Sequence, residues 1–275
     1  MNSMANGADV EITNPQTWRL ALRINDDCVR FAAYSEVGQG SLISREVSLD
    51  GSGDDFLRSL ENCIYDNPLF LLDYNRVVMS FTSQHFMLVP GSMSDDSAID
   101  AFNALFGSVQ GDILVDTLPR CGVKIVFELP AGVLRFINRT FESATIHHHL
   151  WAMCEHFAAK CANAGVCREY VYLHDGTADV CIFSHSKLNL ANSYVCHSVD
   201  DAAFFTLNAW KCFGLSADAD ELQMLGDRTM RDALAPVLRN YITYVMPAIF
   251  PAASMRMGHD AMKAPYDLIL LLLCE

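Results

Sequence analysis

The feature that most constrains the fold of this chain is the order of elements predicted between residues 168 and 227. Two apolar segments, residues 168–174 and 179–184, flank the short turn Asp175-Gly176-Thr177, which predicts an antiparallel hairpin. A third strand is predicted at residues 187–196, and Ser198 begins a helix that ends at Gly214. A further strand, residues 221–227, ends in Gly-Asp. This order predicts a compact α/β lobe.

The first half of the chain follows the same order with slight residue identity. Asp26-Asp27 forms the first turn, Ser52 begins a helix with Asp55 three residues on, and Asn67-Pro68 ends that helix. The strands around these elements are predicted at residues 18–25, 28–35, 42–49 and 76–81. No low-complexity linker separates the halves, so the sequence predicts two packed lobes, which we place at residues 16–142 and 143–275.

Three other segments carry expectations that a structure can test. Residues 76–81 and 86–89 have the period of a hairpin. A long helix is expected at roughly residues 147–164, where it crosses into the second lobe. Residues 268–273 (LILLLL) are far too short a run to span a membrane, and their flanks favour a buried central strand.

Charge and composition limit the partners. The chain has 275 residues, 51% of them apolar, and a formal charge of −14, so it is globular and lacks the positive charge that attracts nucleic acid or anionic lipid. The first 17 residues contain neither a basic residue nor an apolar stretch, so we expect a cytoplasmic protein without membrane insertion. In that compartment the ten cysteines are expected to be reduced core thiols.

Several of these segments resemble a bacterial family of unknown function whose members share the actin-like fold of sugar kinases, heat-shock proteins and actin. The resemblance rests on LNLANSY at residues 188–194, ELQMLGD at 221–227, the Val89-Pro90 junction and PYDLILLLLC at 265–274. It implies an α/β, two-lobed, duplicated ribonuclease H-like fold with mixed sheets flanked by helices. More distant relatives that the resemblance implies include ATPases, sugar kinases and the actin-like proteins of pilus assembly.

The resemblance also implies where a nucleotide would bind, which is between the first hairpin turns of the two lobes. Such turns hold phosphate with backbone N–H groups and hydroxyls, while an aspartate orients Mg²⁺ or water. The first turn, with Asp27, has no Gly, Ser or Thr, whereas the second offers Asp175, Gly176 and Thr177. The second turn is better explained as a plain hairpin turn in which Gly176 supplies a positive φ. Near the C-terminus, residues 255–259 contain one glycine where actin-like enzymes present Gly-Gly to adenine. We therefore infer that these turns have lost the ability to bind phosphate.

Metal and nucleophile motifs are absent from the sequence. His147, His148, His149 and His156, with the neighbouring cysteines, are not spaced to chelate one ion from the expected helix. No Gly-x-Ser-x-Gly, His-Glu-x-x-His or Cys-x-x-Cys segment occurs. We expect neither a catalytic residue nor a metal site.

Three functions remain open at this point. The first is a non-catalytic pseudo-ATPase that acts as a scaffold or protein-binding module, through a protein partner or self-association, with no cofactor. The second is a divergent ATPase or phosphotransferase that binds Mg-ATP with Asp27 and Asp175 across the cleft and Gly176 and Thr177 at the phosphate. The third is a peripheral platform protein like the pilus-assembly actin homologues.

Overall fold

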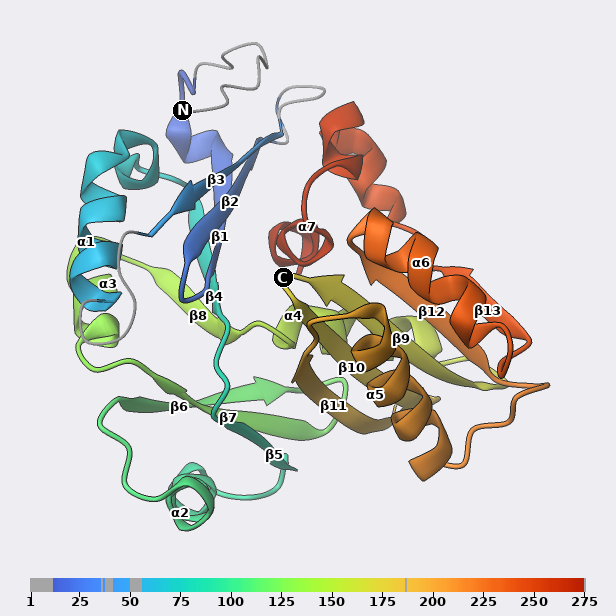
Figure 1. The fold of residues 1–275 in the computed structure, drawn as a ribbon. Helices are drawn as coiled ribbons and strands as arrows, with labels where there is room; N and C mark the ends of the chain where they lie inside the picture. Colours follow the sequence, from blue (N-terminus) through green and yellow to red (C-terminus); the bar gives the residue numbers. More distant parts are fainter. Residues whose placement is uncertain (1–11, 36, 38–41, 50–55, 186, 275) are drawn as a thin grey trace.

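The computed structural model describes residues 12–35, 37, 42–49, 56–185 and 187–274, which form three sheets. Two five-stranded sheets face each other across helices α4 (Trp151–Cys161) and α7 (Tyr266–Leu273), and a smaller sheet lies at one end (Figure 1). Helix α7 packs on β1, β2 and β4 of the first sheet and on α4. The middle of the molecule is therefore a layer of two helices between two sheets.

The first sheet has the strand order β3-β2-β1-β4-β8. Strands β1 and β2 are antiparallel, and β4 and β8 continue the sheet in parallel. Helices α1 and α3 cover its outer face (Figure 1). The bounds are β1 (Trp18–Ile24), β2 (Cys28–Ser35), β3 (Ile43–Ser48), α1 (Phe56–Asp66), β4 (Arg76–Phe81), α3 (Val133–Thr140) and β8 (Ala144–His148), with the short 3-10 helices η1 (Pro15–Thr17) and η3 (Pro68–Leu71).

The second sheet repeats the arrangement with the order β11-β10-β9-β12-β13. Its first three strands are antiparallel neighbours, and β12 and β13 are added in parallel. Helices α5 and α6 cover its outer face (Figure 1). The matching strand orders confirm the predicted duplication. The bounds are β9 (Cys167–His174), β10 (Thr177–Ser184), β11 (Lys187–Val195), α5 (Val199–Cys212), β12 (Glu221–Gly226), α6 (Arg228–Leu238) and β13 (Tyr244–Pro247), followed by the 3-10 helices η4 (Ala252–Met257) and η5 (His259–Met262).

A third sheet, with the order β5-β7-β6, packs on helix α2 through a small core of its own. Its elements are β5 (Phe86–Pro90), α2 (Asp95–Phe106), β6 (Asp112–Leu118) and β7 (Val123–Leu129). The predicted hairpin of residues 76–81 and 86–89 is wrong, because β4 pairs with β1 and β8 whereas β5 pairs with β7 in a different sheet. Alternation identifies a half-buried strand but not the strand it pairs with.

Two other expectations were also wrong. Residues 268–273 belong to helix α7 and not to a strand. The prediction failed because a short helix buried between two sheets is apolar on nearly all sides, so its sequence resembles that of a buried strand. His147 and His148 belong to strand β8, and α4 begins only at Trp151. The described part of the chain contains no helix that could cross a membrane. The predicted cap at Ser52 lies outside the described residues.

The boundary near residue 142 stays a prediction, and two segments beyond it lie on the first sheet. Strand β8 pairs with β4, and α7 packs on β1. The C-terminal segment of the chain therefore completes the packing of its N-terminal sheet.

A buried carboxyl group interrupts the outer core of the second lobe. Strand β9 places Glu169 between Ile182 of β10 and Leu222 of β12, both members of the apolar cluster under α5 and α6. Glu169 is 0% exposed, and neither carboxyl oxygen has a hydrogen-bond partner among the described residues. Burial raises the pKa of Glu169 well above its usual value, so the folded protein keeps a proton that the unfolded chain releases.

This proton predicts a pH dependence of stability that the Glu169→Gln variant lacks. Above the unfolded pKa of about 4.3 the unfolded state binds fewer protons than the folded state, so rising pH favours unfolding, by up to about 1.4 kcal/mol per pH unit. The free energy of unfolding of the natural protein minus that of Glu169→Gln should therefore fall from pH 5 upward. Urea unfolding of both proteins at a series of pH values measures this difference. A constant difference would show that Glu169 is ionised in the folded state.

Candidate functional site

Two arginines on the first hairpin face the second lobe. In the antiparallel pairing of β1 and β2, Arg23 lies directly opposite Arg30, so both side chains leave the same face of the sheet. Arg23 is only 1% exposed although it carries a permanent charge. Such a side chain needs several acceptors, and the opposite lobe supplies them.

The hairpin turn of the second lobe brings Asp175 to these arginines. Asp175 has φ 48° and Gly176 has φ 69°, the two positive values of a tight hairpin turn, and Thr177 begins β10. The carbonyl oxygen of Gly176 accepts a hydrogen bond of 2.7 Å from the Cys196 amide. This geometry is that of the simple hairpin turn considered from the sequence.

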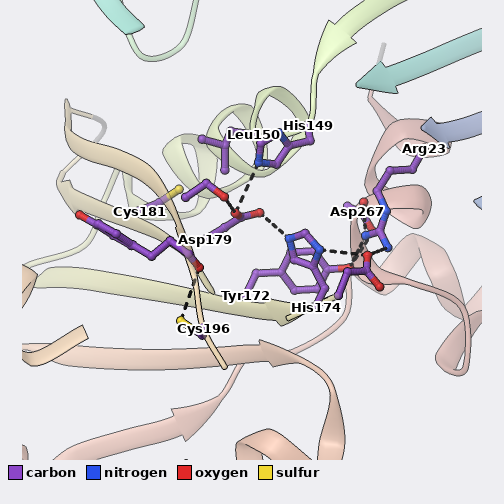
Figure 2. A network of polar contacts seen from close by, with 12 residues as sticks. Arg23, His149, Leu150, Tyr172, His174, Asp179, Cys181, Cys196 and Asp267 are labelled. Carbon is purple, nitrogen blue, oxygen red and sulfur yellow. Dashed lines mark hydrogen bonds and ion pairs between the residues drawn. The ribbon is translucent and has the colours of Figure 1, made fainter. Parts of the chain in front are cut away.

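The contacts between the lobes centre on Arg23 (Figure 2). Its Nη2 donates to Asp175 Oδ2 at 2.6 Å, and its Nη1 donates to Asp267 Oδ2 at 2.8 Å. Arg30 forms a second ion pair with the same oxygen of Asp175. The hydroxyl of Tyr172 donates to Asp267 Oδ1 at 2.7 Å. Arg23 therefore joins the first sheet to the second hairpin and to helix α7.

His174 extends this network into the second lobe. Its Nε2 lies 2.8 Å from Asp179 Oδ2, and its Nδ1 lies 3.3 Å from Asp175 Oδ2. Asp179 also accepts a 2.6 Å hydrogen bond from the Ser193 hydroxyl and lies 3.4 Å from His149 Nε2. Residues Arg23, Arg30, His149, Tyr172, His174, Asp175, Asp179, Ser193 and Asp267 are called the inter-lobe network below.

The charges within the inter-lobe network compensate one another. Burial alone would lower the pKa of His174, but the charge of Asp179 and hydrogen bonds to Asp175 and Asp179 raise it to about 9. Burial opposes ionisation of Asp175 as well, yet His174, Arg30 and Arg23 hold its pKa well below the usual range. The pKa of Asp267 is lowered in the same way, against burial, mainly by Arg23. At neutral pH these groups are therefore charged, and each is paired with a group of opposite charge.

The four residues considered for nucleotide binding lie on two hairpin turns. Asp175, Gly176 and Thr177 lie together at the second hairpin, where Asp175 is bound by arginine. Asp27 lies exposed at the first hairpin turn, and its carbonyl oxygen accepts a hydrogen bond of 2.7 Å from the Leu49 amide. The charges of Asp27 and Asp175 both act on the Cys28 thiol, whose pKa is raised to about 11, first of all by burial. Within the described ranges, no group of three or more His, Cys, Asp or Glu side chains could hold a metal ion.

A cavity of about 710 Å³ adjoins the inter-lobe network. It lies between the second hairpin, the junction of β12 with α6, and the chain from Ala248 to Tyr266. Gly226 at the end of β12 has φ 86°, and Asp227 caps α6 by accepting a 2.7 Å hydrogen bond from the Met230 amide. Residues 255–259, considered for the adenine side, run from η4 through Gly258 to the first residue of η5.

Sequence reasoning missed the principal residues of this site, namely Arg23, Arg30, His174, Asp179 and Asp267. One signal was available: Arg23 occupies an otherwise apolar strand, WRLALRI, in which every residue except Arg19 is buried. A cation at such a position requires an acceptor in the core.

The architecture defines the class of protein as an actin-like α/β fold. A crystal structure of a Bacteroides thetaiotaomicron VPI-5482 protein, described as having an actin-like ATPase fold and unknown function, matches with a TM-score of 0.78 at 21% identity. The match covers 97% of this chain and 99% of that chain. The PilM-PilN type IV pilus biogenesis complex matches with a TM-score of 0.55 at 14% identity, covering 94% of this chain and 99% of the other.

The chain belongs to the family described as protein of unknown function (DUF3822), which matches residues 8–245. No curated protein matches the chain. The family and the fold class inferred from the sequence are thereby confirmed.

Proposed function

We propose that this protein is a non-catalytic member of the actin-like fold that works in the cytoplasm as a protein-binding scaffold. The observation that carries the proposal is the pairing of Asp175 with both Arg23 and Arg30. An aspartate that is to orient Mg²⁺ or a water molecule at a phosphate needs its negative charge for that task, and two guanidinium groups already compensate the charge of Asp175. To serve the alternative ATPase, Asp175 would have to leave two arginines and His174.

The inter-lobe network also supports a fixed arrangement of the lobes. Arg23 is buried, and moving the second hairpin away would separate it from Asp175 and leave its charge without that partner. A scaffold benefits from such a rigid shape because little freedom is then lost when a partner binds.

Exposed aromatic side chains support the protein-binding part of the proposal. The edge strand β13 carries Tyr244, which is 46% exposed, and Tyr241 just before it is 62% exposed. Tyrosine is enriched in protein interfaces, and the edge of a sheet can accept a further strand. The PilM-PilN complex shows that a chain of similar fold forms part of an assembly.

Nucleotide chemistry is tested by comparing ATP with Mg²⁺ against ATP with EDTA. A non-catalytic scaffold should release no phosphate, and Mg²⁺ should add no stability to the ATP-treated protein in thermal unfolding. A functional Mg-ATP site would instead add about 2.7 kcal/mol at a 100-fold excess over the Kd. Such Mg²⁺-dependent stabilisation, or steady release of phosphate, would contradict the proposal.

Partner binding is tested by crosslinking and quantitative capture with the Tyr241→Ser/Tyr244→Ser double variant. Phe204→Ser on α5, also an exposed aromatic position, is the matched control. The same proteins should be captured by the natural chain and the control and lost with the double variant. Equal capture by all three proteins would exclude this edge as the binding surface.

A further inference from the structure

The cavity of about 710 Å³ beside the inter-lobe network has a basic lining in an otherwise acidic protein. Among the described residues, five arginine and lysine side chains, besides the charged His174, and two carboxylates line the cavity, whereas the whole chain has a formal charge of −14. The five are Arg23, Arg30, Arg228, Arg231 and Lys263. A concentration of positive charge against the sign of the whole molecule favours an anionic ligand at this place.

Both carboxylates of the lining are already bound within the protein. Asp175 is paired with Arg23 and Arg30, and Asp227 caps helix α6. They therefore compete little for Arg228 and Arg231, the two arginines in the first turns of α6.

These two arginines have donors available for a ligand. Arg228 is paired only at 3.5 Å with Asp232, and both side chains are largely exposed, so this pair is weak. The Nε atom of Arg231 is buried and has no hydrogen-bond partner among the residues described. The Arg231 side chain forms no ion pair or hydrogen bond with another described residue, so its terminal Nη groups are not committed within the protein.

Part of the cavity lining is apolar. The rings of Phe250 and Tyr266 lie 4.8 Å apart at 62°, and Ala264 and Pro265 adjoin them. The hydroxyl of Tyr266 donates to the carbonyl oxygen of Ile249 at 3.3 Å, so its polar end is already engaged. A volume of about 710 Å³ is in the range of small-molecule sites.

We propose that this cavity binds a small organic anion, a phosphate or carboxylate group on an apolar body, directly through Arg228 and Arg231 and without a divalent metal ion. Arginine pairs with such groups through two parallel hydrogen bonds, which supply orientation as well as affinity. The apolar body would pack on Phe250 and Tyr266. The inference goes beyond the proposed scaffold function, which requires no small ligand.

The test is calorimetric titration in EDTA with three matched probes: phenyl phosphate, inorganic phosphate and phenol. Phenyl phosphate should bind saturably and more tightly than inorganic phosphate, and phenol should not bind. In the Arg228→Gln/Arg231→Gln double variant the affinity for phenyl phosphate should fall about tenfold or more, since charge-assisted hydrogen bonds are lost. Arg58→Gln, an exposed arginine on α1 of the other lobe, should leave the affinity unchanged.

Three results would overturn the inference: no saturable binding of phenyl phosphate at millimolar concentration, equal affinity in the natural protein and the double variant, or inorganic phosphate binding as tightly as phenyl phosphate. Thermal unfolding of each variant verifies that it is folded. The outcome is independent of the scaffold proposal, because that proposal fails on Mg²⁺-dependent nucleotide chemistry and this one fails on anion binding in EDTA.

Discussion

Replacing Arg23 with methionine is expected to lower the free energy of unfolding by about 3–5 kcal/mol, the usual cost of removing one partner from a buried ion pair. Methionine fills much of the arginine volume, so the loss reports the charge and its hydrogen bonds rather than an empty space. Asp267 would remain buried in α7 with Tyr172 as its remaining hydrogen-bond donor. Urea unfolding of the natural and variant proteins measures the change.

Two further variants show whether the loss of stability in Arg23→Met arises from the inter-lobe network. Arg139→Met removes an ion pair with Glu61 that is largely exposed, and we expect it to cost less than about 1 kcal/mol. Adding Asp267→Leu to Arg23→Met should cost less than the sum of the two single changes, because no unpaired carboxylate is left. If Arg23→Met costs no more than Arg139→Met, the lobes are not joined through this arginine.

Replacing Gly226 with alanine is expected to lower the free energy of unfolding by roughly 3–5 kcal/mol, through a strained backbone and a direct collision. Gly226 has φ 86°, and a Cβ atom there would lie 1.9 Å from the carbonyl oxygen of Leu173 on β9. That oxygen already accepts a 2.7 Å hydrogen bond from the Asp227 amide, so it cannot move away without loss. Thermal and urea unfolding measure the effect.

The Gly214→Ala variant distinguishes backbone strain from the steric collision. Gly214 also has a positive φ, 66°, but a Cβ atom there meets nothing within 4 Å. Alanine at this position should cost only the left-handed conformation, about 1–2 kcal/mol. Equal losses in the two variants would mean that the approach of β12 to Leu173 is not close enough to require glycine.

The sequence predicted the repeated lobe because its signals are local. Alternation in β9 to β11, the cap at Ser198 and the turn at Asp175-Gly176 each depend on neighbours in the chain. Helix α7 could not be predicted in this way. Its residues 268–273 are all apolar and therefore show no helical period, and what makes them a helix is the space between two sheets.

Most residues of the candidate site could not be predicted from the sequence, for a related reason. Arg23 lies 149 residues from Tyr172 and 244 residues from Asp267 along the chain, and it shares hydrogen bonds with both. No local pattern links such positions. The hairpin turn at Asp175 could be predicted from the sequence, but the arginines of the other lobe that neutralise this aspartate could not.

The position of α7 has a consequence for how the protein is made. The N-terminal sheet leaves the ribosome long before residues 266–273, which cover β1, β2 and β4. Until helix α7 emerges, the apolar face of β1, β2 and β4 that it covers stays exposed, and chaperones can bind there. Synthesis from N- to C-terminus therefore cannot complete one lobe before it starts the other, and the two halves must mature together.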